Sequence, residues 1–437
     1  MSTQTTTRFD EHALAELPEA AGFTGELRLR ALREFEAMPI PSQETEEWRY
    51  TDLSNFELDF IPFSPGGGPD AVNRRGVLEA AGVVGERAGL QIQRNSEVIS
   101  TELLAGWSEA GVIFGDLDVA AATHPDLVET YLHSLVPTSR TKFLALHGAF
   151  RTAGTFLYVP DGVEIELPLQ TVTYLDADGA AVFPHTLIVV GTNASVTFID
   201  RYISSDLTRA FSDAVTEIVV GDGARVRYAS IQDWGSGVTH LGVQRAQVGR
   251  DADLRTLAIG FGADLSRAEA ETILAEPGGF SEMLGVFFAD GDQHFDHRTL
   301  QDHVAPNCRS DLLYKGALRD RSRAVYSGWV HVRPDAQKTN AMQTSRNIVL
   351  SEHAKADAIP NLEIEANDVR CGHAASVGPV DEETIFYLQS RGITREDAER
   401  LIVTGFFQEV LDRVTIDEVR RGAEAAIARE LAGGARG

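Results

Sequence analysis

Cysteine is nearly absent from this 437-residue sequence, which contains only Cys308 and Cys371. Two cysteines cannot make the disulfide framework of a small secreted protein, and no Cys-x-x-Cys pair is present. A four-thiolate zinc or iron–sulfur site therefore cannot be built from one copy of the chain. The scarcity of cysteine also favours the reducing cytoplasm as the compartment.

Lysine is scarce too, because Lys142, Lys315, Lys338 and Lys355 are the only four, and the formal net charge is −26. Proteins bind nucleic acids and anionic membranes largely through Lys and Arg. Such an excess of acid argues against both kinds of partner. The excess of acidic residues with little lysine fits a surface adapted to high salt or a biased genome composition equally well. Neither interpretation indicates a function.

Long apolar runs and several catalytic motifs are also missing. No stretch approaches 18 apolar residues, so no membrane-spanning helix is expected. The opening "MSTQTTTRFDEHAL" lacks the apolar core of a secretory signal. There is no G-x-x-x-x-G-K-[ST] phosphate loop and no G-x-S-x-G elbow. Any ATP hydrolysis that the function needs must come from another chain.

The middle of the chain contains an internal repeat. "VGTNASVTFI" begins at Val190, "VGDGARVRYA" at Val220 and "VGRDADLRTL" at Val248, so the starts are 30 (220 − 190) and 28 (248 − 220) residues apart. Similar turns at Gly162 and Gly279 extend the series in both directions. Each unit is a turn with Gly, Asn or Asp followed by a short alternating strand, which is typical of a half-buried strand.

This repeat predicts a mainly β protein with a β-helix core, a stacked solenoid whose coils bury their inward side chains against their neighbours. We expect each period of about 30 residues to make two short coils. A β-sandwich with coincidental turn spacing is the alternative.

Helical patterns flank the repeat and predict α-helical caps at both ends, which would cover the open ends of the stacked core. Segments 25–38 and 126–136 have helical apolar spacing on the N-terminal side. On the C-terminal side, two helices are expected within 381–414 and a third over 417–432, with Thr394 as an N-cap. We therefore divide the chain into 1–145, a β-helix core over 146–380 and a helical domain over 381–437.

Cys371 and His373 are the first candidate metal ligands, in the segment "VRCGHAASVG". Both residue types bind soft or borderline metals. If the segment is an extended strand, the two side chains project from the same face and could contact one ion or cluster. Two neighbouring core residues would give the same pattern, so the residues alone leave both readings open.

A second candidate is the stretch "DGDQHFDHRTLQDHVAPNCRS", which contains His294, His297 and His303. These histidines alternate with aspartates, and Cys308 follows closely. The stretch is either a metal-binding strand and turn or a set of polar side chains on the outer face of the solenoid. In the second case Cys308 is a small buried hydrophobic residue.

Four further segments are distinctive: "EEWRYTDL", "DHVAPNCRSDLLYKGAL", the long run from "NAMQTSRNIVL" to "FYLQSRGI", and "DAERLIVTGFF". In these segments the chain resembles the SUF iron–sulfur cluster assembly scaffold proteins, SufB and SufD. The resemblance covers most of the chain and is strongest over 285–414. The chain is more similar to SufD than to SufB, because it is shorter and lacks extra N-terminal cysteines.

The resemblance implies a non-enzymatic scaffold in a complex with a SufB-like subunit and a SufC-like ATPase, or a homodimer when alone. A nascent, transient iron–sulfur cluster would form at the interface with the SufB-like chain. His373 matches the family's interface histidine, and Cys371 matches a cysteine of less certain role. The C-terminal helices match the region that docks the ATPase, and the candidate docking residues there are Phe386, Tyr387, Leu401, Phe406 and Val410.

Two other functions remain open from the sequence. A β-helix carbohydrate-active enzyme, a lyase or hydrolase, would use carboxylates along a groove of the solenoid. A chain of charge −26 would repel acidic polysaccharides unless a cation intervened. The other alternative is a purely structural partner subunit in which Cys371 and His373 are inert.

Overall fold

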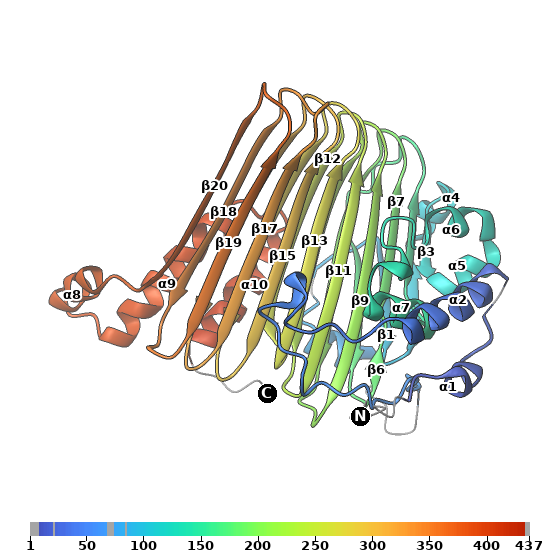
Figure 1. Ribbon diagram of the computed structural model, residues 1–437, viewed down its shortest axis with the longest axis horizontal. Coiled ribbons are helices and arrows are strands. Elements are labelled where there is room, and N and C mark those ends of the chain that lie inside the picture. Colours follow the sequence, from blue (N-terminus) through green and yellow to red (C-terminus); the bar gives the residue numbers. More distant parts are fainter. Residues whose placement is uncertain (1–7, 21, 68–73, 84, 433–437) are drawn as a thin grey trace.

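A computed structural model describes residues 8–20, 22–67, 74–83 and 85–432 and shows two long, mainly parallel β-sheets that face each other (Figure 1). The chain alternates between the sheets and makes a β-solenoid of about 8 turns, which confirms the predicted fold class. Consecutive coils pair in parallel with a constant register, as between β10 and β12. A β-sandwich has no such ladder of successive coils, so that alternative is wrong.

Sheet 1 contains ten strands, and its spatial order ends at β20. From one edge to the other these are β2 (Glu97–Leu103), β1 (Gly89–Arg94), β5 (Leu169–Leu175), β8 (Ser195–Ser204), β10 (Arg225–Trp234), β12 (Asp253–Gly262), β14 (Phe280–Ala289), β16 (Arg309–Leu318), β18 (Asn340–Val349) and β20 (Arg370–Pro379).

Sheet 2 runs alongside and ends at β19. Its strands are β19 (Lys355–Ile364), β17 (Arg323–Val332), β15 (His294–His303), β13 (Leu265–Leu274), β11 (Val238–Val248), β9 (Ala210–Val220), β7 (His185–Val190), β4 (Thr155–Val159) and β3 (Ile113–Asp116), with β6 (Ala181–Val182) beside β9.

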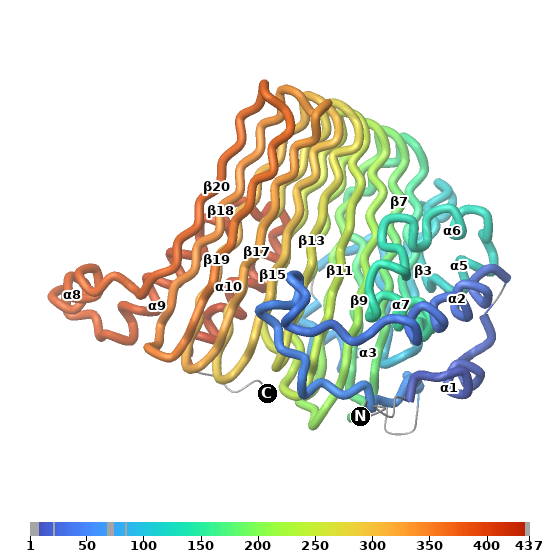
Figure 2. Tube along the Cα trace, viewed as in Figure 1, coloured from blue at the N-terminus to red at the C-terminus, as the bar shows by residue number. Residues whose placement is uncertain are grey.

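One repeat period makes one coil with a strand in each sheet, rather than the two short coils expected from the sequence. β8 and β9 form one such coil, and the Figure 2 trace shows the chain passing from sheet to sheet at each turn. The turns of successive coils stack closely. Asn193 and Gly223 occupy equivalent turn positions with positive φ of 55° and 66°, which explains the Gly, Asn and Asp of the repeat.

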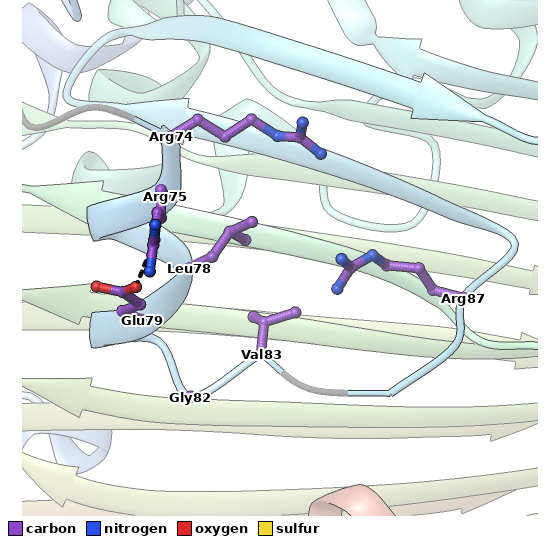
Figure 3. Close-up of a pocket in the computed structure, with 7 residues that line it drawn as sticks. All are labelled: Arg74, Arg75, Leu78, Glu79, Gly82, Val83 and Arg87. Atoms are coloured by element: carbon purple, nitrogen blue, oxygen red, sulfur yellow. Dashed lines mark hydrogen bonds and ion pairs between the residues drawn. The ribbon is translucent and has the colours of Figure 1, made fainter.

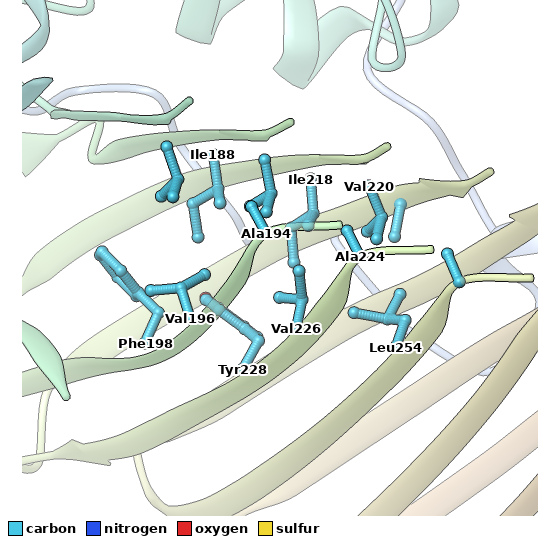
Figure 4. Packing of buried hydrophobic residues seen from close by; sticks show 14 of the residues in the cluster. Ile188, Ala194, Val196, Phe198, Ile218, Val220, Ala224, Val226, Tyr228 and Leu254 are labelled. Carbon is cyan, nitrogen blue, oxygen red and sulfur yellow. The ribbon is translucent and has the colours of Figure 1, made fainter. Parts of the chain in front are cut away.

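The core lies between the sheets. Val196 and Phe198 of β8 and Val226 and Tyr228 of β10 meet Ile218 of β9, and all are buried (Figure 4). These side chains occupy every second position along each strand, so the alternation in the sequence marks the inward face. Each coil covers the side chains of the previous one, and burial therefore depends on stacking.

The N-terminal helices pack mainly on the outer face of sheet 2 (Figure 1). There, Phe143 and Phe150 lie in one cluster with Phe211 and Leu241 of the sheet. The helical segments are α1 (Glu11–Ala15), α2 (Phe23–Ala37), η1 (Glu46–Trp48), α3 (Arg74–Ala80), α4 (Ala105–Glu109), α5 (Leu117–Thr123), α6 (Pro125–Tyr131), η2 (Thr138–Arg140) and α7 (Lys142–Phe150).

The C-terminal helices are α8 (Glu382–Ser390), α9 (Arg395–Leu411) and α10 (Asp417–Leu431). Thr394 caps α9, since its hydroxyl accepts from Asp397 N at 3.1 Å, as the sequence predicted. These helices pack on the outer face of sheet 1, where Val403 and Phe407 join Leu313 in one buried cluster. They therefore lie along the side of the solenoid, and the coil of β19 and β20 is left exposed.

Candidate functional site

Among the described residues, the last coil has a stacked neighbour on one side only. β20 pairs with β18 at one edge of sheet 1, and β19 pairs with β17 at the corresponding edge of sheet 2. Arg370 N donates to Thr339 O at 2.8 Å, and Lys355 N donates to Ser322 O at 3.0 Å. Backbone groups of a parallel strand alternate in direction, so the next residue along each strand points its N–H toward the open side.

Four N–H groups of β20 face that open side by this alternation, namely those of Cys371, His373, Ala375 and Val377. On β19 the corresponding positions include Pro360, which has no N–H to expose. Unpaired edges of this kind recruit strands from other chains. The end of the solenoid is therefore a surface on which another β-edge can pair.

Cys371 and His373 project from the same face of β20, as expected for an extended segment. Their register partners on β18 are Ala341 and Gln343, which are both buried in the solenoid interior. His373 is exposed and Cys371 is half-buried, because no further coil in the described part of the chain covers them. Both side chains are accessible to a partner that approaches the open end.

The surroundings of Cys371 favour the protonated form of its thiol. Burial raises its pKa, and this outweighs the opposing effect of a backbone hydrogen bond with Ala341. Thiolate, not thiol, binds iron. A metal ion or a base from a partner is therefore needed before Cys371 can act as a ligand.

A further group of metal-binding residue types lies at the same end of the solenoid. His331 on β17 is the register partner of Glu363 on β19, and Glu365 lies two residues beyond Glu363. The ligand atoms of these three residues lie within 4.8 Å of one another. The sequence did not reveal this group, because its members are brought together only by the pairing of coils 32 residues apart (363 − 331).

Among the described residues, the histidines of β15 are not brought together with one another or with Cys308 into a group of metal-binding side chains. His297 points inward, with its ring centroid 4.6 Å from that of Phe287, and His303 Nε2 lies 2.8 Å from Ser310 Oγ. His294 lies near Thr51 instead. Cys308 is fully buried, with its Sγ 3.3 Å from Glu276 O, so it is a core thiol. The inward positions of His297 and His303 also correct the idea that these residues all lie on the outer face.

The candidate docking residues separate into two groups. Phe386, Tyr387 and Leu401 are exposed by 73%, 56% and 54%, and Phe406 is partly buried beneath Lys315 Nζ, which lies 4.5 Å from its ring centroid. Val410 is fully buried against sheet 1. Val410 therefore holds α9 on the solenoid and is not available to a partner, whereas the other four residues are wholly or partly accessible.

A cavity of about 550 Å³ lies beside α3 and is lined by Arg74, Arg75 and Arg87 together with Leu78, Glu79, Gly82 and Val83 (Figure 3). Two of its arginines already have partners, because Arg74 pairs with Glu102 and Arg75 with Glu79. The cavity lies near β1, at the opposite edge of sheet 1 from β20. It does not belong to the site at the last coil.

Comparison with known proteins fits this arrangement. Residues 173–406 match the family model for "SUF system FeS cluster assembly, SufBD core domain", and residues 82–171 match that for the "SufBD protein N-terminal region". The chain belongs to the SufBD family. This confirms the resemblance seen in the sequence, and the core match contains Cys371, His373 and the last coil.

Among SufBD relatives, the iron-sulfur cluster assembly protein SufD of Bacillus subtilis (strain 168) is 34% identical over 412 residues, which are 93% of each chain. A SufBD family protein of Mycobacterium leprae (strain TN) is 32% identical over 92% of this chain and 94% of its own. A SufBD family protein of Staphylococcus epidermidis is 30% identical over 90% of this chain and 86% of its own.

In the part of the chain that the structure describes, every helix is too short or too polar to cross a bilayer.

Proposed function

We propose that this chain is a non-enzymatic scaffold subunit of a SUF-type complex that works in the cytoplasm. Iron–sulfur clusters would be assembled where its last coil meets a SufB-like subunit, and a SufC-like ATPase would drive the process. The observation that carries the proposal is the open end of the solenoid, where unpaired edges of β19 and β20 adjoin Cys371 and His373.

His373 is the proposed cluster ligand of this chain, with Cys371 as a second candidate. A neutral imidazole binds iron more weakly than a thiolate does, so a mixed Cys/His interface favours release of the cluster over storage. The cluster is the cargo of the complex and is not expected to remain tightly bound. The scarcity of cysteine in this chain is accounted for if the partner supplies further thiolates.

The ATPase would dock on the exposed apolar side chains of Phe386, Tyr387 and Leu401, with the accessible part of Phe406. Large exposed apolar side chains grouped on a small helical domain are characteristic of interaction surfaces. Ion pairs fix this domain to the solenoid, such as Lys315–Glu409 at 2.5 Å and Arg201–Glu418 at 2.8 Å. A movement of the ATPase would therefore be transmitted to sheet 1.

The names of the relatives, which describe iron–sulfur cluster assembly proteins, support the scaffold over a carbohydrate-active enzyme. The decisive experiment is co-expression with a SufB-like and a SufC-like subunit, followed by anaerobic reconstitution with iron and sulfide. A ternary complex that acquires a chromophoric cluster, which neither this chain nor the ATPase forms alone, is the expected result. A chain that joins no such complex, or that degrades polysaccharides, would overturn the proposal.

A further inference from the structure

Three buried histidines converge between the N-terminal helices and the outer face of sheet 2. His133 follows α6, His147 lies on α7 and His185 begins β7. They are exposed by 8%, 0% and 0%, and one ring nitrogen from each lies within 4.8 Å of the other two. This group is on neither the last coil nor the docking helices.

The hydrogen bonds of the three rings fix which nitrogens carry hydrogen. His133 Nδ1 lies 2.9 Å from Val136 O, and His147 Nδ1 lies 2.8 Å from Asp213 O. A carbonyl oxygen only accepts, so both Nδ1 atoms must donate. For neutral imidazoles, the Nε2 atoms of His133 and His147 are then left with free lone pairs.

His185 is oriented by a carboxylate. Its Nε2 lies 3.2 Å from Glu217 Oε2. Glu217 also accepts backbone N–H bonds from His133, Leu135 and Val136 at 2.7, 2.7 and 2.9 Å. Three such donors match an ionised carboxylate, which accepts from His185 Nε2. The Nδ1 atom of His185 is then the third free lone pair.

One ring nitrogen of each histidine lies within 4.8 Å of the other two, so the three free lone pairs can converge on one point. His147 Nε2 and His185 Nδ1 are only 3.1 Å apart. His133 Nε2 is buried and has no hydrogen-bond partner among the described residues. A proton shared between His147 and His185 would satisfy two of the nitrogens but not the third. A cation at the centre satisfies all three.

We propose that His133 Nε2, His147 Nε2 and His185 Nδ1 bind one first-row divalent metal ion, for which Zn²⁺ is the best match. Three imidazole nitrogens are a common zinc donor set. The other nitrogen of each ring donates a hydrogen bond to an oxygen. This is the outer-shell arrangement that orients metal-bound histidines.

The ion would fasten the N-terminal helical layer to the solenoid, because its ligands come from a loop, a helix and a strand. The test uses the full-length chain, stripped with a chelator, reloaded with Zn²⁺ and passed through gel filtration before metal analysis. We expect one zinc per chain, a melting temperature that falls on chelation, and a visible absorption spectrum with Co²⁺ in place of zinc.

His133→Asn is the most specific variant. Its amide nitrogen can replace Nδ1 as the donor to Val136 O, and Asn tolerates the positive φ of 58° at this position. The ligand nitrogen is lost, so zinc should fall below about a tenth of an equivalent per chain. His240→Asn is the matched control, because His240 is buried with its Nδ1 3.1 Å from Ser212 Oγ and is not part of the group. This control should retain the ion.

Two more variants test the outer shell of this site and its independence from the last coil. Glu217→Gln should weaken zinc binding about 10- to 100-fold through loss of the outer-shell carboxylate. The double variant Cys371→Ser/His373→Ala should keep full zinc uptake, since its substitutions lie on β20. The proposal is overturned if reloaded wild type retains no zinc, if His133→Asn retains as much as wild type, or if the double variant loses it. The wild-type measurement needs no variant to fold.

Discussion

Gln343 on β18 and His373 on β20 are register partners on the inward face of sheet 1, yet Gln343 is fully buried and His373 is exposed. β20 is stacked on Gln343, whereas no strand of the described residues is stacked on His373. The solenoid therefore ends with its interior surface and its backbone edges accessible. The functional proposal depends on what covers this end.

The first prediction concerns pairing at the open edge. Ala375→Pro removes an N–H that faces the open side, so the β18–β20 ladder should survive while binding of a SufB-like chain, or self-association, is weakened. Ala374→Pro is the matched control, because its N–H faces β18 and its loss should destabilise the coil itself. Analytical ultracentrifugation measures the association of both variant chains. Unchanged association of a folded Ala375→Pro chain would count against edge pairing.

The second prediction concerns the ATPase surface. Phe386→Asp places a charge on an exposed apolar side chain, so the fold should be unaffected while co-purification with the ATPase falls at least about tenfold. Val119→Asp is a suitable control, since Val119 is 61% exposed and lies on α5, among the N-terminal helices. Equal recovery of the ATPase with both variants would contradict the assignment.

The third prediction concerns Asp296, which holds the N-terminal segment on sheet 2. Its carboxylate accepts from Thr51 Oγ1 at 2.6 Å and pairs with Arg267 at 2.5 Å. Burial alone would raise its pKa, but the guanidiniums of Arg267 and Arg298 outweigh burial and hold the pKa below its usual value. Asp296→Asn should lower stability at pH 7 by about 1.5–3 kcal/mol, because Arg267 Nη1 loses its charged acceptor and keeps only the pairing of Nη2 with Glu269.

This loss should depend on pH with a definite sign. A carboxyl whose pKa is lower in the folded state stabilises the protein above its unfolded pKa, and that contribution disappears as pH falls through the folded pKa. Urea unfolding midpoints of wild type and Asp296→Asn should therefore differ at pH 7 and converge in strongly acidic solution. A difference that stays constant between these limits would show that the carboxylate charge is not responsible.

The sequence correctly predicted a β-solenoid, but it predicted two coils for each period where the structure has one. Alternation is clear in β10, whose outward side chains are partly exposed at the start of the strand. It is absent from β9, where Ala210–Val220 is buried on both faces because helices cover sheet 2 there. Only one strand of each period was therefore visible as a pattern, and the length of the coil was misjudged.

The candidate sites also differ in whether the local sequence pattern reveals them. Cys371 and His373 could be predicted as a pair because they lie two residues apart on one strand, where alternation alone places them together. His133, His147 and His185 are separated by 14 (147 − 133) and 38 (185 − 147) residues. Their meeting depends on how α7 packs against sheet 2, which local pattern does not encode. The burial of Val410 likewise depends on which face of α9 meets sheet 1.

The fourth prediction separates a core role of Cys371 from a ligand role. Its thiol packs against the buried cluster of Val330, Val332, Ala336 and Ala341. Cys371→Ser should cost about 1 kcal/mol of stability, because a hydroxyl replaces a half-buried thiol. We expect a smaller loss of cluster yield than on changing His373. A fully stable variant that forms no cluster would instead make Cys371 the principal ligand.

The most direct test of the central claim is the cluster yield of a His373→Ala complex, measured by iron and sulfide content and visible absorption after anaerobic reconstitution and after expression in cells. His373 is exposed, so its truncation should leave folding and assembly with the partners intact. The account predicts a complex of normal composition with a strongly reduced cluster yield. A His373→Ala complex that assembles clusters at the wild-type yield in both settings would contradict it.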